Sequence, residues 1–216
     1  MSILTLLNCC PLPAALTSIT ATTCPVEKGQ IQRVFFVRRT YVQWNTVTPA
    51  SNVPAAIASF LPTVVAGWTI LRAAIGNTKV VIPPLFGGDI TITPGEAIKV
   101  GGNDNTTLNG ETYVNGYSPS TFAARFDSLT ATQTSQLKEL RCESLEAYFV
   151  NQDGDIIGRR VGDLFVGFNA KALVVNSRKV DGFGTRNANT IEFQLDADWD
   201  AEFEIITPTD FNALTF

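Results

Sequence analysis

The segment IEFQLDADWDAEFEII, from Ile191 to Ile206, constrains the fold more than any other part of the sequence. Its odd positions from 191 to 205 are all apolar, whereas its even positions from 192 to 204 are Glu, Gln or Asp. Successive side chains leave a β-strand on opposite faces, so this alternation predicts strand structure with one face in a core. The other face carries six carboxylates, which repel one another unless water or a cation surrounds them.

A turn is expected inside this segment. One straight strand of this length would span about 50 Å, well beyond the usual strand of about 3 to 10 residues. We therefore expect a turn near Ala197 to Asp200, with a strand on either side. The acidic side chains are candidates for a face that lines a lumen or an interface between subunits: Glu192, Asp196, Asp198, Asp200, Glu202 and Glu204. Those at 196, 198 and 200 belong to the loop tip if the turn lies there.

The acidity of the chain is local to this segment. The formal net charge is −4, and the residues outside 191–206 comprise 14 acidic and 16 basic ones. Ordinary nucleic-acid-binding proteins carry a basic stripe that neutralises phosphates, and this sequence shows only two short basic pairs. These are candidate partners for the acidic face of a neighbouring subunit: Arg38, Arg39, Arg159 and Arg160.

Several chemistries are excluded by composition. The chain lacks histidine, which removes the usual general base near neutral pH, the Ser/His/Asp arrangements and the commonest zinc ligand. Cys9, Cys10, Cys24 and Cys142 contain no pair with C-x-x-C spacing. The NQDGD sequence at 151–155 favours a tight hairpin over a calcium loop, because Arg160 stands where the loop needs a Glu. We therefore expect no enzyme activity, catalytic residue, cofactor or bound metal.

The domain organisation follows from length and charge. A chain of 216 residues with 45% hydrophobic residues, 16 Gly and 11 Pro suits one β-rich domain with many turns. Residues 1–27 contain one acidic residue and no Lys or Arg, so we interpret them as an N-terminal assembly arm, followed by a single domain at 28–216. The uncharged stretch 41–71 is interrupted by proline and glycine, so no membrane span is expected.

Most of the domain is predicted to be strand, with one long helix. Thr130 followed by Gln133 forms a capping-box pattern, and the helix should run from about Ala131 to Glu146. A short helix is expected at 51–60. Strands are expected from β-branched and aromatic runs and from turn residues at the following ranges: 31–44, 63–75, 78–86 and, around a turn at Asp153 and Gly154, 146–162.

Four stretches carry a resemblance to known proteins: GEAIKVGGNDNTT, YSPSTF, LEAYFVNQDGDI and IITPTDFNALTF. Across about residues 94 to 216 they resemble an unassigned family of virion proteins from phages that infect Bacteroidetes. The combination of one helix, many strands, an uncharged arm and an acidic terminal segment also resembles tail-tube proteins of tailed bacteriophages. This resemblance implies a β-barrel or β-sandwich with one flanking helix, and no catalytic residue or cofactor.

The same resemblance implies a structural role in a virion assembled in the host cytoplasm. The chain would form hexameric rings that stack into a tube, contact other virion proteins and let DNA pass without specific binding. Carboxylates facing a water-filled bore would repel phosphate, whereas Lys or Arg would bind it. Alternatives are a tail terminator, a connector ring, a capsid decoration protein, or a monomeric calcium- or glycan-binding β-module.

Overall fold

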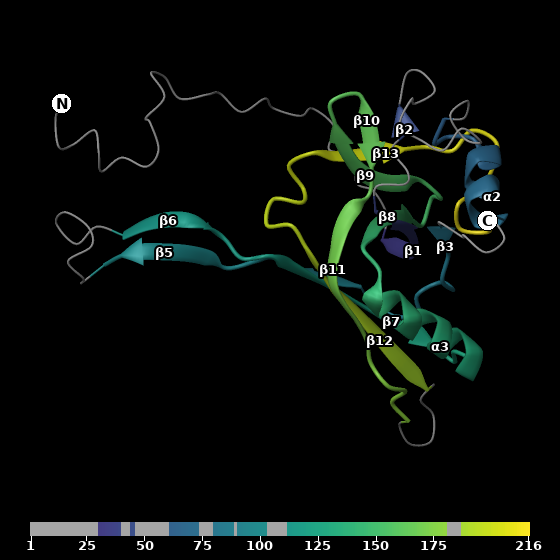
Figure 1. Ribbon diagram of the computed structural model, residues 1–216, viewed down its shortest axis with the longest axis horizontal. Coiled ribbons are helices and arrows are strands. Elements are labelled where there is room, and N and C mark those ends of the chain that lie inside the picture. The colour runs from purple at the N-terminus through teal and green to yellow at the C-terminus, as the bar shows by residue number, and fades with distance from the viewer. Residues whose placement is uncertain are drawn as a thin grey trace. The chain divides into compact units, whose positions relative to one another are not determined.

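The computed structural model describes residues 30–39, 44–45, 61–73, 80–88, 90–102, 112–180 and 187–216 (Figure 1). They fall into two units: the smaller includes residues 97–116, and the larger includes 28–96 and 117–216. The predicted assembly arm at 1–27 and the predicted helix at 51–60 lie outside the described residues. Among the helices of the described part, none is long and apolar enough to cross a membrane.

The larger unit is built from two antiparallel sheets. Sheet A is formed by these strands: β1 (Ile31–Arg38), β2 (Trp44–Asn45), β3 (Val80–Val81), β8 (Leu145–Asn151), β9 (Ile156–Val161), β10 (Leu164–Val166) and β13 (Phe203–Ile206). Sheet B is formed by β4 (Thr91–Thr93), β7 (Ser120–Asp127) and β12 (Ala188–Leu195). The strand β11 (Phe168–Val175) belongs to both sheets.

The strand order of the larger unit stays open. It runs from β2 at one end to β4 at the other, and within the described residues these two strands do not pair with each other. The prediction of a mainly β fold is therefore confirmed as a sandwich-like fold and not as a closed barrel.

A bend in β11 connects the two sheets. Its first residues, Phe168 to Ala170, pair with β8 in sheet A, whereas Lys171 and Val174 pair with β12 in sheet B. Ala172 lies between these pairings with φ 51°, and the register shifts there. A bulge of this kind bends a strand and increases its local twist. Figure 1 shows β11 as a long curved strand that runs from β8 towards β12.

The main core lies between the sheets and is dominated by phenylalanine. Phe122 of β7, Phe149 of β8 and Phe193 of β12 are completely buried or nearly so. The ring of Phe122 stacks on Phe193 with centroids 4.5 Å apart and on Phe149 at 5.1 Å. Stacked aromatic pairs stabilise a core by about 0.5–1.5 kcal/mol beyond the burial of their area. The predicted apolar parity of Ile191, Phe193 and Leu195 is confirmed, because all three are buried in this core.

A second core covers the opposite face of sheet A. The helix α2 (Val65–Ala73) and the C-terminal residues pack here, and Figure 1 places the C-terminus beside α2. Trp68 of α2 is completely buried and meets Phe35 and Tyr148 edge-on, with centroids 5.5 and 5.4 Å apart. Because both faces of sheet A are covered, every residue of β8 is buried.

The prediction of a strand at 63–75 is wrong for its greater part, because Val65–Ala73 is α2. Trp68 and Leu71 are three residues apart and both buried, which is helical spacing. The Oδ1 of Asp210 accepts a hydrogen bond of 2.8 Å from the backbone N–H of Val65 and so satisfies one donor at the helix start. The β-branched residues that suggested a strand are therefore overridden by packing on sheet A.

The long helix is shorter than predicted. The helix α3 covers Ala131–Glu139, and a 3-10 turn, η2 (Leu140–Cys142), follows it. The expectation of helix to 146 is wrong, since Leu145 and Glu146 already belong to β8 and pair with β1.

The predicted capping box at the start of α3 is confirmed. Thr130 Oγ1 accepts from Gln133 N at 3.2 Å, and Gln133 Oε1 accepts from Thr130 N at 2.9 Å. The two side chains therefore satisfy two backbone donors that the helix start leaves without partners.

The hairpin predicted around Asp153 and Gly154 is confirmed. It joins β8 to β9, and Gly154 adopts a φ of 87°, which favours glycine. Asn151 Oδ1 accepts hydrogen bonds from the backbone N–H groups of Asp153 and Asp155 at 3.0 and 2.9 Å. Asp155 Oδ1 accepts a further bond of 2.7 Å from Thr207 Oγ1. The polar side chains of NQDGD therefore close the turn itself.

The smaller unit contains a two-stranded sheet formed by β5 (Ala97–Gly101) and β6 (Thr112–Tyr117). Its large apolar side chains are exposed to between 42% and 51%, and they are Ile98, Val100, Tyr113 and Val114. Most of the Gly/Asn-rich loop between the strands lies outside the described residues. A two-stranded hairpin is marginally stable alone, and exposed apolar side chains gathered in this way are typical of interaction surfaces.

Replacing Thr130 with Ala should lower the free energy of unfolding by about 1 kcal/mol, because the substitution removes the N-cap acceptor of α3. Chemical denaturation followed by circular dichroism measures the change. Ser135→Ala, at an exposed position of the same helix, is the matched control and should change stability by less than about 0.5 kcal/mol. Equal stability of the two variants would contradict a stabilising cap.

Candidate functional site

The acidic segment is divided between the two sheets. Its first half is β12, which pairs with β7 and β11, and its last residues are β13, which pairs with β9. Residues 196–202 connect them, and we call this connection the corner. The predicted turn at Ala197 to Asp200 is confirmed within it. The two strands do not form a hairpin with each other, because each continues a different sheet of the sandwich.

The six candidate acidic residues consequently do not share one continuous face. Glu192 is exposed on the outer face of sheet B, next to Asn176. The corner contains four of the six, which are Asp196, Asp198, Asp200 and Glu202. Glu204 lies in β13 and is half-buried. The alternation of apolar and acidic residues in the sequence thus continues where the chain passes from sheet B to sheet A. The alternation alone does not reveal this change of sheet.

Three of the four candidate arginines contact carboxylates of their own chain. Arg160 lies 3.3 Å from Glu204, and Arg159 lies 4.0 Å from Glu202. Arg38 forms a two-pronged pair with Glu143, with N–O distances of 2.8 and 2.7 Å. Arg39 is exposed at the end of β1. Exposed ion pairs each stabilise a fold by about 0–1 kcal/mol, so these contacts leave the arginines able to exchange partners.

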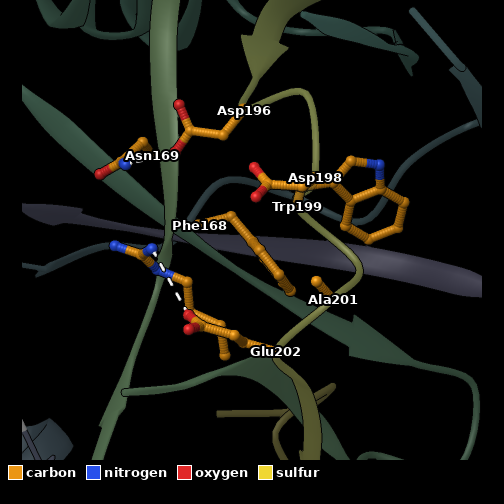
Figure 2. A pocket seen from close by; sticks show the side chains of 8 residues that line it. Phe168, Asn169, Asp196, Asp198, Trp199, Ala201 and Glu202 are labelled. Carbon is orange, nitrogen blue, oxygen red and sulfur yellow. Dashed lines mark hydrogen bonds and ion pairs between the residues drawn. The ribbon is translucent and has the colours of Figure 1, made fainter. Parts of the chain in front are cut away.

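A small pocket lies at the corner (Figure 2). Its volume is about 230 Å³, and its lining combines aromatic and charged side chains: Arg159, Phe168, Asn169, Asp196, Asp198, Trp199, Ala201 and Glu202. Sites for drug-sized ligands usually have volumes of about 300–1,000 Å³. The pocket is thus large enough for a side chain or a few waters, and smaller than an oligosaccharide site requires.

Asp196 is the centre of the hydrogen bonds around this pocket. Its Oδ2 accepts from Asn169 Nδ2 at 2.5 Å, and its Oδ1 accepts from Lys171 Nζ at 2.5 Å. Figure 2 shows Asn169 of β11 next to Asp196. Burial acts to raise the pKa of Asp196, but the hydrogen bonds from Lys171 and Asn169 outweigh it, so the pKa is lowered. Asp196 therefore stays charged near neutral pH and ties the corner to β11.

Glu146 is a further titratable residue of this region that the sequence analysis missed. It lies in β8, is only 6% exposed and stands opposite Asn169 across the β8–β11 pairing. Burial raises the pKa of Glu146 to about 7, although a hydrogen bond from the Gly167 backbone and the charges of Arg159 and Arg39 act to lower it. The signal available in the sequence was the lone charge within the otherwise uncharged strand LEAYFVN.

No known protein-family model matches the chain, and a search of curated proteins finds no match either. Within the described ranges, no group of three or more Asp, Glu or Cys side chains is placed to hold a metal ion. Ion pairs and hydrogen bonds connect the corner to the strands β9 and β11. Absence of enzyme activity stays a prediction.

Glu146 should make stability depend on pH. Its pKa is about 7 in the folded protein, above the ordinary 4.5, so its stabilising effect is complete below about pH 4.5 and is lost as the pH rises through 7. Between pH 5 and pH 8 the free energy of unfolding should fall by on the order of 3 kcal/mol more in the native protein than in Glu146→Gln. Urea denaturation at both pH values measures this difference.

The matched control for this measurement is Glu139→Gln, an exposed change of the same kind on α3. It should retain the pH dependence of the native protein, because Glu146 and its neighbours are left unchanged. If Glu146→Gln and the native protein lose the same stability between pH 5 and pH 8, Glu146 is already ionised in the folded state at pH 5.

Proposed function

We propose that the chain is a structural protein of a phage virion, and specifically a tail tube subunit that forms stacked hexameric rings around a DNA conduit. The sandwich with α3 at its flank agrees with the architecture that the resemblance implies. The observation that carries the proposal is the chemistry of the outer face of sheet B, which is exposed and has a low density of positive charge.

The outer face of sheet B presents short uncharged side chains and one acid: Thr91, Thr93, Thr121, Thr190, Glu192 and Gln194. Two cations on the same face are ion-paired, Arg125 with Asp127 at 2.7 Å and Lys171 with Asp196 at 2.5 Å. Each cation that neutralises a phosphate releases counterions and strengthens binding to DNA. Arg125 and Lys171 are thus already paired, and Lys179, beside Ala188 at the end of the face, is a third cation. A face that is otherwise neutral or acidic suits a wall along which DNA passes without being held.

Assembly into rings is supported by uncovered edges and apolar side chains. Within the described part of the chain, β4 pairs only with β7 and β13 pairs only with β9, so each has an open side. Open strand edges are places where another chain can add a strand. The exposed apolar side chains of the β5–β6 hairpin are a second candidate contact. The N-terminal arm at 1–27 stays a predicted third one.

Assembly can be tested on the purified chain. We expect sizing chromatography and electron microscopy to show rings or tubes rather than a 23.4 kDa monomer. The double variant Ile98→Lys and Val114→Lys should give a folded monomer, because it places charges on the exposed apolar surface of the hairpin. Ser135→Lys, an exposed charge addition on α3, should still assemble.

A monomeric native protein would instead favour the calcium- or glycan-binding β-module. Closed rings that do not stack would favour a tail terminator, a connector ring or a decoration protein over the tube. Assembly of the hairpin variant as efficient as that of the native chain would exclude the hairpin as a contact.

The conduit itself is tested by the pair of substitutions Glu192→Lys and Gln194→Lys. Both residues are exposed on sheet B, so the fold should be retained while the face becomes positive. Assembled tubes of this variant should retain DNA, with an affinity that falls steeply as salt is added. Filter binding across a salt series measures this, and Glu139→Lys on α3 is the control that should bind no more DNA than the native tubes.

Dispersed rings in the Glu192→Lys and Gln194→Lys variant would contradict the conduit and favour the rival arrangement, in which the acidic residues meet arginines of the next ring. Intact tubes that bind no more DNA than the control would place sheet B on the outer surface of the assembly.

A further inference from the structure

Two residues paired across β8 and β11 each carry a buried side-chain oxygen atom that lacks a hydrogen-bond donor. Glu146 and Asn169 are 6% and 8% exposed, and they are directly paired in the antiparallel register. Directly opposed residues project on the same side of the sheet, with Cβ atoms about 5 Å apart. Within the described structure, neither Glu146 Oε2 nor Asn169 Oδ1 has a hydrogen-bond partner. A buried polar atom left without a partner destabilises the fold.

The orientation of the Asn169 amide is determined by Asp196. Asn169 Nδ2 donates to the carboxylate of Asp196 at 2.5 Å, so turning the amide would place one oxygen against another there. The Oδ1 atom is thus held away from Asp196 and needs a donor elsewhere. Glu146 already accepts a hydrogen bond from the Gly167 backbone, which leaves Oε2 as the atom that can carry a proton.

The charged and titratable neighbours of Glu146 come from several elements. Arg159 of β9 donates from Nε to the Gly167 carbonyl at 3.1 Å, and Arg39 follows β1, so both favour a charged Glu146 from a distance. Asp196, paired with Lys171, adds a negative charge beyond Asn169. Tyr148 follows two residues along β8 on the same face. Burial outweighs the two arginines and raises the pKa of Glu146 to about 7.

We propose that Glu146 carries a proton on Oε2 and donates it to Asn169 Oδ1, and that loss of this proton to solvent releases the corner. An ionised Glu146 can only accept, so the Asn169 amide turns and donates from Nδ2 to Glu146. Asp196 then loses Asn169 and keeps only Lys171. The corner, including the half-buried Trp199, is consequently held less tightly against β11.

This switch has a defined two-state element, which is the orientation of one buried amide. Each orientation supplies the amide donor to a different carboxylate, and only the first also gives Asn169 Oδ1 a donor, because the turned amide faces Asp196 with its oxygen. The switch depends on contacts within a single chain and is independent of the proposed function. Its failure would therefore leave the proposed assembly untouched, and a failure of assembly would leave the switch intact.

The experiment follows the two ends of the switch separately by nuclear magnetic resonance between pH 5 and pH 9. The side-chain carboxyl ¹³C signal of Glu146, assigned by its absence in Glu146→Gln, reports the proton directly. The ¹⁹F signal of fluorotryptophan at Trp199, assigned with Trp199→Phe, reports the corner. We expect both signals to change together with a midpoint near pH 7.

Glu146→Gln and Asn169→Leu should give opposite results at Trp199. The amide that Glu146→Gln introduces can donate to Asn169 Oδ1 at every pH, so the Trp199 signal should stay at its low-pH position. The leucine side chain in Asn169→Leu cannot hold Asp196, so there the signal should stay at its high-pH position. Glu139→Gln should titrate as the native protein does.

The proposal is overturned if the Glu146 carboxyl of the native protein titrates near its ordinary pKa of 4.5. It is also overturned if Trp199 in Glu146→Gln follows pH as it does in the native protein. The carboxyl titration is read in the native chain, so it decides the matter even if a variant does not fold.

Discussion

The change of sheet within β11 is the constraint on which the sandwich depends. Phe168 to Ala170 extend sheet A beside β8, and after Ala172 the same strand continues in sheet B beside β12. This single bend brings the two apolar faces together, so that Phe122 and Phe193 of one sheet meet Phe149 of the other. The corner at 196–202 returns the chain from sheet B to sheet A, so it must cross the same side of the core.

These two crossings explain why polar residues gather where they do. At the place where a strand leaves one sheet for another, backbone pairing is interrupted and side chains must satisfy the exposed groups. Asn169 and Lys171 of β11 therefore meet Asp196 of the corner, and Arg159 bonds to the carbonyl of Gly167. The buried Glu146 belongs to the same interruption, because it accepts from the backbone of Gly167. The polar residues gather here because of the sheet topology as much as because of the charged residues of the acidic segment.

Local patterns predicted local structure well. The capping box of α3, the hairpin at Asp153 and the turn after Leu195 are each specified by neighbouring residues, and each is present. The α2 helix and the early start of β8 could not be predicted in the same way. Their apolar residues suit either secondary structure, and the choice depends on sheet A, whose strands come from distant parts of the chain.

The candidate site shows the same division between local and long-range information. Alternation correctly indicated which side chains of 191–195 are buried, but it could not assign β12 and β13 to different sheets. Arg159 and Arg160 were expected to meet acidic residues of a neighbouring subunit, which stays a prediction, and within the chain they lie beside Glu202 and Glu204. Glu146 was missed because burial of its neighbours on both faces of β8 is a property of the assembled layers.

The pairing of β1 with β8 has a consequence for synthesis of the chain. Ile31 pairs with Asn151 and Arg38 with Leu145. The strand β1 is therefore synthesised more than a hundred residues before β8, the strand with which it pairs. Until then its apolar run VFFV has only the short β3 beside it. Long-range pairing of this kind slows folding and leaves an unpaired, aggregation-prone strand exposed on the growing chain. Arg33 and Arg38, on either side of that run, place charge where aggregation would otherwise begin.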